Sequence, residues 1–286
     1  MIIDAHQHFW KLARGDYPWP NETVADIFYD FEPADLAPLL CAAGVDHTVL
    51  VQATDTVAET EFLLQIANNV EWVAGVVGWT DLEAIDAIDV IDRLHQHPAL
   101  KGLRPMLQNI ADTDWILQDT VAPALSHMAD LGLCFDALIQ PRHLEAIEQI
   151  AKRHPTLAIV IDHIAKPKMG GAQAPDNVWV DGMARLADLP NVHCKLSGLV
   201  TEIGPTWKMA DLAPFAGYVL QTFGPDRVLF GSDWPVVNLA SSYTGWRESV
   251  DTILADFSPE DRTKIMGRNA AAFYGLCGHD KKASQW

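Results

Sequence analysis

Short apolar runs alternate with longer segments of helical period eight times along the 286 residues of this chain. The runs are residues 2–9, 47–52, 72–78, 101–107, 133–139, 157–163, 191–197 and 228–233. Such alternation is typical of parallel βα units, and eight units in a chain of this length predict an α/β fold, the (β/α)8 TIM barrel. An open doubly wound sheet shares the alternation, but it usually carries a Gly-rich phosphate loop after its first strand. The first run here ends in His-Gln-His instead.

The segments between the runs show apolar residues recurring at three and four, as in helices that pack on a sheet. They are residues 34–44, 60–69, 83–96, 114–131, 143–154, 178–189, 211–224 and 246–257. The stretch richest in Gly and Pro, residues 166–177, lies between periodic segments, and neither a Ser/Gly tether nor a block of like charge divides the chain. We therefore expect a single barrel domain, residues 1–286.

Charge and hydropathy exclude several classes of partner. A formal net charge of −18 with scattered Lys and Arg argues against nucleic acid, which needs a clustered positive surface. The apolar runs are too short to span a membrane, and the chain starts in a strand with no basic or apolar leader, so a cytoplasmic location is expected. The sequence leaves open whether the chain forms a homo-oligomer.

The cysteines give no sign of a disulfide or metal motif. Cys41, Cys134, Cys194 and Cys277 are far apart and form no C-x-x-C pair. Cys134 and Cys194 fall inside apolar strand patterns, where a reduced buried thiol is the usual occupant. We interpret them as structural.

The first ten residues, MIIDAHQHFW, place two histidines one residue apart on the first predicted strand. Because side chains alternate along a strand, Asp4, His6 and His8 are expected on one face and Ile3 and Ala5 on the other. Two imidazoles on one face can hold a divalent metal or polarise a carbonyl and shuttle protons. Taken alone, such a pair can also be two surface histidines or two hydrogen-bonded interior ones.

The barrel hypothesis turns strand alternation into a site prediction, because inward side chains near the carboxyl ends of the strands form the active sites of such barrels. With the apolar residues facing the helices, the inward set is His6, His8, Arg104, Asp136, Gln140, Lys195 and Asp233, with His163 beside them. An interior charge without a partner is very unfavourable, so a single shared site is the simplest explanation of the set. The other histidines are expected to be solvated, capping or core groups: His47, His95, His97, His127, His143, His154, His193 and His279.

Five motifs extend this prediction: DAHQHFW, GLRPMLQ, DHIAKP, CKLSGL and LFGSDWP. Together they resemble the amidohydrolase superfamily, in particular its branch of sugar-lactone hydrolases of the L-fuconolactonase and L-rhamnonolactonase type. Lactonases of 2-pyrone-4,6-dicarboxylate are similar at a greater distance. The resemblance covers nearly the whole chain.

The resemblance implies catalytic roles for four residues. Asp233 would take the proton from the attacking water. His6, His8 and His163 would either bind one divalent ion together with Asp233, zinc being the first expectation, or directly polarise the carbonyl and protonate the leaving oxygen.

Three further residues would bind the substrate. Arg104 and Lys195 would hold the polar substrate or its carbonyl. Trp19 lies in a candidate mouth loop, as do Trp10 and Trp234, where a tryptophan either stacks on a sugar ring or packs the loop base.

Two lysines bear on the number of metal ions. Superfamily members with two metals typically use a carboxylated lysine in mid-barrel, and Lys101 lies at the wrong end of its strand to supply one. Several metal-dependent relatives have a histidine where the seventh strand here offers Lys195, and a cation there weakens the attraction for a second cation. At most one ion is expected, and the site is also compatible with catalysis without metal.

The resemblance implies a lactonase, a hydrolase acting on a carboxylic ester in carbohydrate metabolism. It would convert a sugar lactone, such as L-fucono- or L-rhamnono-lactone, to the aldonic acid by water attack on the carbonyl. The alternative is a metal-dependent non-hydrolytic decarboxylase on the same scaffold. A barrel that only binds a sugar acid is a third possibility, against which His6, His8 and Asp233 argue.

Overall fold

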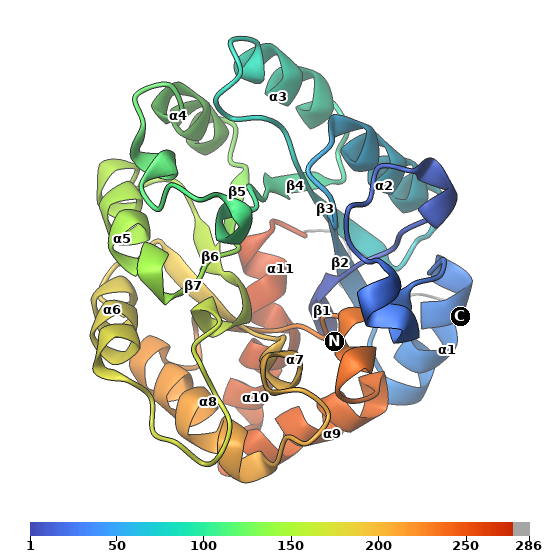
Figure 1. The fold of residues 1–286 in the computed structure, drawn as a ribbon, viewed down its shortest axis with the longest axis vertical. Coiled ribbons are helices and arrows are strands. Elements are labelled where there is room, and N and C mark those ends of the chain that lie inside the picture. The colour runs from blue at the N-terminus through green and yellow to red at the C-terminus, as the bar shows by residue number, and fades with distance from the viewer. Residues whose placement is uncertain (277–286) are drawn as a thin grey trace.

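Eight parallel strands form the centre of the structure, and each is hydrogen-bonded to the next in sequence order. They are β1 Ile3–Gln7, β2 His47–Val51, β3 Val73–Gly78, β4 Leu100–Leu103, β5 Cys134–Ala137, β6 Ile159–Ile161, β7 Val192–Leu196 and β8 Val228–Phe230. In this computed structural model, which describes residues 1–276, they surround a common centre (Figure 1). A parallel bridge between Gln7 and Trp234 joins the last unit to the first. The predicted (β/α)8 barrel is confirmed.

Helices surround the strands and pack their apolar faces on them (Figure 1). They are α1 Pro33–Ala43, α2 Val57–Asn69, α3 Ala87–His95, α4 Ala122–Asp130, α5 Leu144–Arg153, α6 Asn177–Ala187, α7 Leu199–Ile203, α8 Met209–Phe223, α9 Tyr243–Ile253, α10 Pro259–Thr263 and α11 Asn269–Phe273. The helix expected over residues 114–131 starts only at Ala122, because its first part forms a separate 3-10 turn at Trp115–Leu117. The short helices α7, α10 and α11 were not predicted.

The first strand departs from simple alternation. Between Asp4 and Gln7 the chain advances three residues while its neighbour β2 advances two, from Thr48 to Leu50, which is a β-bulge with one extra residue in β1. The bulge corrects the prediction for Asp4: its carboxylate accepts a hydrogen bond from the hydroxyl of Tyr243 on α9 (3.1 Å) and does not face the barrel interior with the histidines.

Helix α11 lies under the amino end of the barrel and closes it. Its residue Ala270, together with Tyr274 and Leu276 just beyond it, belongs to a small core with inward side chains of the strands, among them Ile3 and Val49. Ile3 and Ala5, which belongs to the same core, were predicted to face the helices, so these assignments were wrong for the same reason as that of Asp4. Cys277 and His279 lie outside the described residues.

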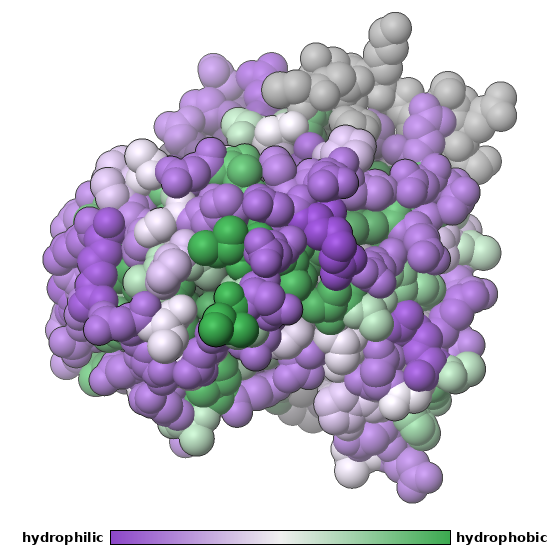
Figure 2. Space-filling model, turned by 90° about the horizontal axis from the view of Figure 1, so that it is seen from above, coloured by the Kyte–Doolittle hydropathy of each residue, from purple (hydrophilic) through white to green (hydrophobic). Residues whose placement is uncertain are grey.

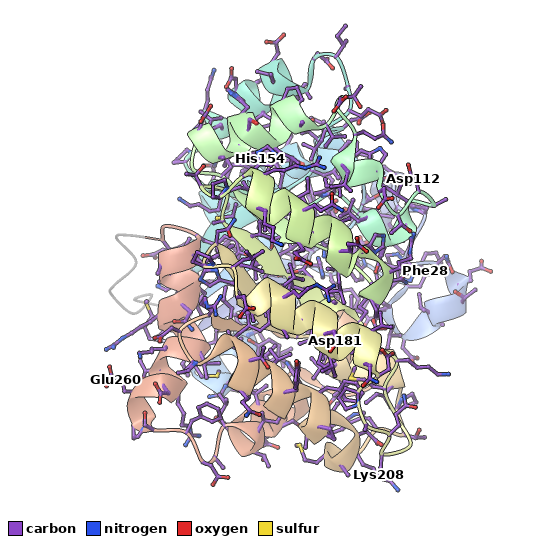
Figure 3. All side chains as sticks on the ribbon, turned by 90° about the vertical axis from the view of Figure 1, so that its left-hand side faces the viewer. Phe28, Asp112, His154, Asp181, Lys208 and Glu260 are labelled. Atoms are coloured by element: carbon purple, nitrogen blue, oxygen red, sulfur yellow. The ribbon has the colours of Figure 1, made fainter. Side chains whose placement is uncertain are left out.

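The loops that follow the strands gather at the other end. Phe28 and Asp112, from the loops after β1 and β4, lie at one edge of the molecule, and Glu260 of α10 lies at the opposite edge (Figure 3). Gln140 was predicted to be inward, but it is exposed at the start of the 3-10 turn Pro141–His143. The carboxyl end of the barrel is therefore the end built from long loops.

The face in Figure 2 is mostly hydrophilic, and apolar side chains reach it in small separate patches. Among residues 1–276, no helix combines the length and the apolar character needed to cross a bilayer. Cys134 and Cys194 are buried free thiols, as expected.

Close contact between β4 and β5 leads to a stability prediction. A Cβ on Gly102 would lie 2.6 Å from the carbonyl oxygen of Cys134, so Gly102→Ala forces the two strands apart. We expect this variant to lose about 1–3 kcal/mol of unfolding free energy, measured by urea denaturation. Gly217→Ala in α8 is the control, because a Cβ there meets nothing within 4 Å. It should gain up to about 1 kcal/mol, and equal stability of the two variants would contradict the close approach.

Candidate active site

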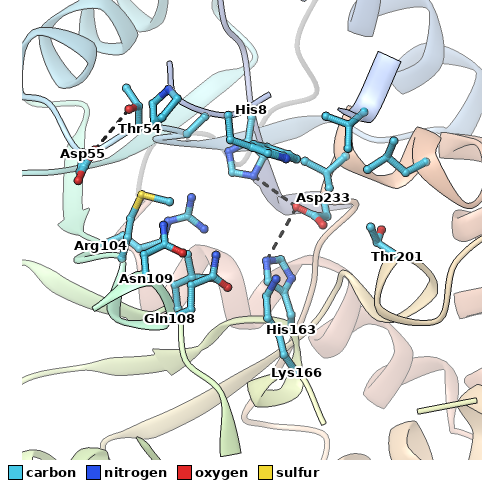
Figure 4. A pocket seen from close by; sticks show the side chains of 18 residues that line it. His8, Thr54, Asp55, Arg104, Gln108, Asn109, His163, Lys166, Thr201 and Asp233 are labelled. Atoms are coloured by element: carbon cyan, nitrogen blue, oxygen red, sulfur yellow. Dashed lines mark hydrogen bonds and ion pairs between the residues drawn. The ribbon is translucent and has the colours of Figure 1, made fainter. Parts of the chain in front are cut away.

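A cavity of about 440 Å³ opens at the carboxyl end of the barrel (Figure 4). The polar side chains that line it are His8, Thr54, Asp55, Arg104, Gln108, Asn109, His163, Lys166, Thr201 and Asp233. Apolar side chains, including Trp19 and Leu138, complete the wall. A concave site of this size with a few converging polar groups is typical of a small-molecule site.

Asp233 is the centre of the polar floor. Its Oδ1 atom lies 3.3 Å from Nε2 of His8, 3.7 Å from Nε2 of His6 and 3.9 Å from Nε2 of His163. The carboxylate is nearly buried, with 5% of its surface exposed. Burial acts to raise the pKa of Asp233, but attraction to the three imidazoles, that of His163 first, outweighs it and holds the pKa below its usual range. The carboxylate is therefore ionised at neutral pH.

Two of these side chains stand on unusual backbone. Residues His163 to Lys166 follow β6 with φ between 47° and 61°, and Asp233 follows β8 with φ of 59°. The left-handed region is unfavourable for residues with a Cβ, and it is found mainly where the surrounding structure enforces it, often at functional sites. The turn after β6 brings both His163 and Lys166 into the cavity wall.

Glycines make room for the imidazoles. Gly198 has φ of +71°, and a Cβ there would lie 2.4 Å from Nδ1 of His163. A Cβ on Gly231 would lie 2.8 Å from Cβ of His6. The glycines of the CKLSGL and LFGSDWP motifs thus allow the close packing of the site.

The ring nitrogens away from the cavity have fixed partners. Nδ1 of His8 donates to the carbonyl oxygen of Val51 at 2.8 Å, and Nδ1 of His163 lies 2.9 Å from the hydroxyl of Ser197. Such partners orient the opposite nitrogen, Nε2, and they accompany most metal-bound histidines.

Ligand atoms of His6, His8 and Asp233 lie within 4.8 Å of one another, as do those of a second group, His6, Asp162 and His163. Imidazole nitrogens with one carboxylate oxygen are ligands that zinc prefers, so the chemistry of the first group fits one divalent ion. In the second group, Asp162 is already paired with two cations, Arg104 and Lys195, which makes it the weaker candidate.

A buried ion cluster lies below the histidines. Nζ of Lys195 is 2.5 Å from Oδ2 of Asp136 and 3.0 Å from Oδ1 of Asp162, and all three side chains are fully buried. Burial raises the pKa of Asp136, whereas for Asp162 the attraction to Lys195, His6 and Arg104 outweighs burial and holds its pKa well below its usual range.

Arg104 connects the cluster to the cavity. Its Nη1 donates to Oδ2 of Asp162 at 3.2 Å, and Nη2 donates to Oε1 of Gln52 at 2.8 Å and to the backbone carbonyl of Gln52. The guanidinium is therefore held rigidly from behind while its side chain lines the cavity.

The predicted site residues occupy different layers. His8, His163, Asp233, Arg104 and Trp19 line the cavity. His6 and Lys195 are fully buried and lie beneath its floor. Trp10 and Trp234 are buried as well and pack around Phe31 with their rings, so these two indoles fill the loop base.

Asp162 and Gln52 were missed as members of the site. Asp162 precedes His163 in the DHIAKP motif, so the motif itself carried the signal, but alternation assigns only one of two adjacent residues to the inside. Gln52 follows the apolar strand HTVLV and shows no distinctive pattern. Lys166, in the same motif as Asp162, also went unassigned.

Glu59 was also missed, and it holds the rim of the cavity. Its Oε2 accepts the backbone N–H groups of Ala53 at 3.0 Å and Thr54 at 2.7 Å, two residues that line the cavity. The side chain is fully buried on α2. Burial raises the pKa of Glu59 to about 7, although the two N–H donors act in the opposite direction.

Comparisons with known proteins agree over the whole described barrel. The model of the amidohydrolase family matches residues 3–276. A Burkholderia ambifaria protein named L-fucono-1,5-lactonase is 45% identical over 278 residues, 96% of this chain and 95% of that protein. A protein of that name from Burkholderia multivorans is 34% identical over 286 residues, 96% of each chain. An amidohydrolase of Burkholderia multivorans solved with bound zinc has a TM-score of 0.89 at 33% identity, covering 96% of this chain and 99% of that one.

The raised pKa of Glu59 predicts a pH-dependent stability that Glu59→Gln removes. The pKa is about 7 in the folded protein against a reference of 4.5, so between these pH values the unfolded chain loses the proton while the folded protein keeps it. Wild-type stability therefore falls as pH rises through this window, and the loss is complete above pH 7. The difference in unfolding free energy, Glu59→Gln minus wild type, should therefore rise by roughly 3 kcal/mol between pH 4.5 and pH 7.5. Urea titrations across this range measure it, and a constant difference would refute the assignment.

Proposed function

The chain belongs to the amidohydrolase family, and from this premise we propose that it is a lactonase that hydrolyses a sugar lactone to the aldonic acid. L-fucono-1,5-lactone, in the name of the two relatives, is the first substrate to test. The observation that carries the proposal is the ionised carboxylate of Asp233 at the cavity floor, beside two imidazoles that reach the same cavity.

Asp233 acts as the general base. It holds a water by hydrogen bond and takes one of its protons as the oxygen attacks the lactone carbonyl carbon. His8, at 3.3 Å from the carboxylate, orients it. The attack forms a tetrahedral intermediate whose former carbonyl oxygen carries a negative charge.

Arg104 and Lys166 are the cations that stabilise this oxygen. Both line the cavity, and the contacts of Arg104 with Gln52 and Asp162 fix its guanidinium before the substrate arrives. Donors that need no rearrangement stabilise a developing charge most effectively. We assign this role to Lys166 and not to Lys195, because Lys195 is fully buried and is not among the residues that line the cavity.

His163 delivers the proton that completes the reaction. The bond between the carbonyl carbon and the ring oxygen breaks, and the ring oxygen takes a proton to become the hydroxyl of the aldonic acid. Burial lowers the pKa of His163, so the imidazole is neutral and can pass a proton between Asp233 and the leaving oxygen.

One divalent ion, zinc first, would be held by His6, His8 and Asp233, with His163, whose Nε2 lies 3.9 Å from Oδ1 of Asp233, as a further ligand. When bound, it would polarise the lactone carbonyl and lower the pKa of a bound water. An ester carbonyl is more electrophilic than an amide carbonyl, and an alkoxide leaves more readily than an amine. Hydrolysis by the protein's own hydrogen-bond donors, without a metal ion, is therefore also compatible with the site.

The decarboxylase alternative has little support. Solved dihydroxybenzoate decarboxylases are 14% and 15% identical to this chain and share its fold alone. Release of CO2 from aromatic acids would favour it over the lactonase. A cytoplasmic location and a place in carbohydrate metabolism stay predictions, and the oligomeric state stays open.

Replacing the base tests the assignment directly. Asp233→Asn keeps the shape but cannot take a proton, so turnover of L-fucono-1,5-lactone should fall by about 10³-fold or more with folding intact. A pH-indicator assay measures the rate, and circular dichroism checks the fold. Near-normal hydrolysis by the variant would exclude Asp233 as the base.

The ligand set predicts the metal content. Elemental analysis of the purified protein should find no more than one equivalent of divalent ion, because Asp162 is neutralised by its own cations and leaves a single favourable set. The variant His8→Gln should lower the zinc affinity about 10-fold to 100-fold. Two tightly bound equivalents would show that the second group also binds metal.

A further inference from the structure

Lys195 has three acceptors around its ammonium, and one of them is a histidine of the site. Nζ lies 2.5 Å from Oδ2 of Asp136, 3.0 Å from Oδ1 of Asp162 and 3.1 Å from Nδ1 of His6. An ammonium has three N–H donors and no lone pair. One donor for each acceptor satisfies it completely, and Nδ1 of His6 is then an acceptor.

An imidazole that accepts at Nδ1 carries its proton on Nε2 when it is neutral. Because Nδ1 of His6 faces the ammonium of Lys195 at 3.1 Å and accepts from it, Nδ1 carries no proton and the ring is neutral. Its Nε2 lies 3.2 Å from Nε2 of His8 and 3.7 Å from Oδ1 of Asp233. The carboxylate of Asp233 has no hydrogen to donate, so it can only accept from His6. An N–H on Nε2 of His6 therefore meets an acceptor.

Two other contacts favour the opposite proton position. Oδ1 of Asp162 lies 3.4 Å from Nδ1 of His6, and Nη1 of Arg104 lies 3.4 Å from Nε2. Both are longer than the contact with Lys195. Each of the two atoms also has a closer partner, because Oδ1 of Asp162 lies 3.0 Å from Lys195 and Nη1 of Arg104 lies 3.2 Å from Oδ2 of Asp162. The contact with Lys195, which is the shortest that Nδ1 of His6 makes, therefore determines which ring nitrogen carries the proton.

We propose that Lys195 is a positioning residue that holds the proton of His6 on Nε2, so that His6 is a hydrogen-bond donor toward Asp233 and a poor metal ligand. A zinc ion needs the lone pair of Nε2, which this tautomer does not offer. Lys195 acts through His6, because it is fully buried and lies outside the cavity. It thereby favours the hydrogen-bonded form of the site over the metal-bound one.

The test compares the double variant Lys195→Met/Asp136→Asn with Asp136→Asn alone. The double variant removes one positive and one negative charge together, so the cluster stays balanced, whereas the single variant keeps the hydrogen bond from Lys195 to His6. Zinc affinity, measured by competition with a fluorescent chelator, should be at least about tenfold higher in the double variant than in the single variant. A merely structural role of Lys195 would weaken zinc binding instead. Equal or weaker binding overturns the proposal.

The kinetic readout rests on the proposed lactone hydrolysis and is kept separate. With chelator present, kcat of the double variant should fall about tenfold or more relative to the single variant while KM stays the same, because Lys195 does not touch substrate. An unchanged kcat, or a change in KM alone, contradicts the role. If the wild type has no lactone turnover, the proposed function fails, and zinc affinity still decides on Lys195.

A measurement on the wild-type protein covers the case in which the double variant does not fold. Nitrogen NMR of protein labelled with ¹⁵N-histidine distinguishes protonated from unprotonated ring nitrogens, and His6→Gln identifies the signals of His6. We expect a proton on Nε2 and none on Nδ1. A proton on Nδ1 overturns the proposal.

Discussion

The structure depends on a charge-balanced cluster inside the barrel. Two carboxylates, Asp136 and Asp162, meet two cations, Lys195 and Arg104, where water is largely excluded. Removing one partner of such a cluster leaves a buried charge without compensation, which is strongly destabilising. Lys195, Asp162 and Arg104 each contact the ring of His6, so the cluster supports this histidine of the floor.

The cluster also links the two ends of the barrel. Tyr274, just after α11, donates its hydroxyl to Oδ2 of Asp136 at 2.7 Å, the same oxygen that Lys195 contacts. A chain of contacts therefore runs from the helix that closes the amino end, through Asp136 and Lys195, to His6 and the cavity floor.

The sequence predicted the architecture well, because the alternation of strand-like and helical segments involves many residues at once. It predicted the direction of single side chains less well wherever one extra residue or an unusual turn interrupted the alternation within a strand. The bulge in β1 turned Asp4 toward α9, and the left-handed turn after β6 brought both His163 and Lys166 into the wall. Neither the bulge nor the turn has a periodic signature. Lys195 lies beneath His6 and does not line the cavity. Alternation predicts that a side chain points into the barrel, but it does not predict how far along the barrel axis that side chain lies.

The electrostatics of Asp233 favour a substrate with an activated carbonyl. Attraction to the imidazoles of His163, His8 and His6 outweighs burial and holds the pKa of the carboxylate below its usual range. A carboxylate that stays ionised is always ready to accept a proton, but its low pKa makes it a weak base. A weak base suffices where the carbonyl is electrophilic and the alkoxide leaves readily, as in a lactone, and it is poorly matched to an amide. The low pKa that keeps Asp233 ionised therefore favours esters such as lactones over amides as substrates.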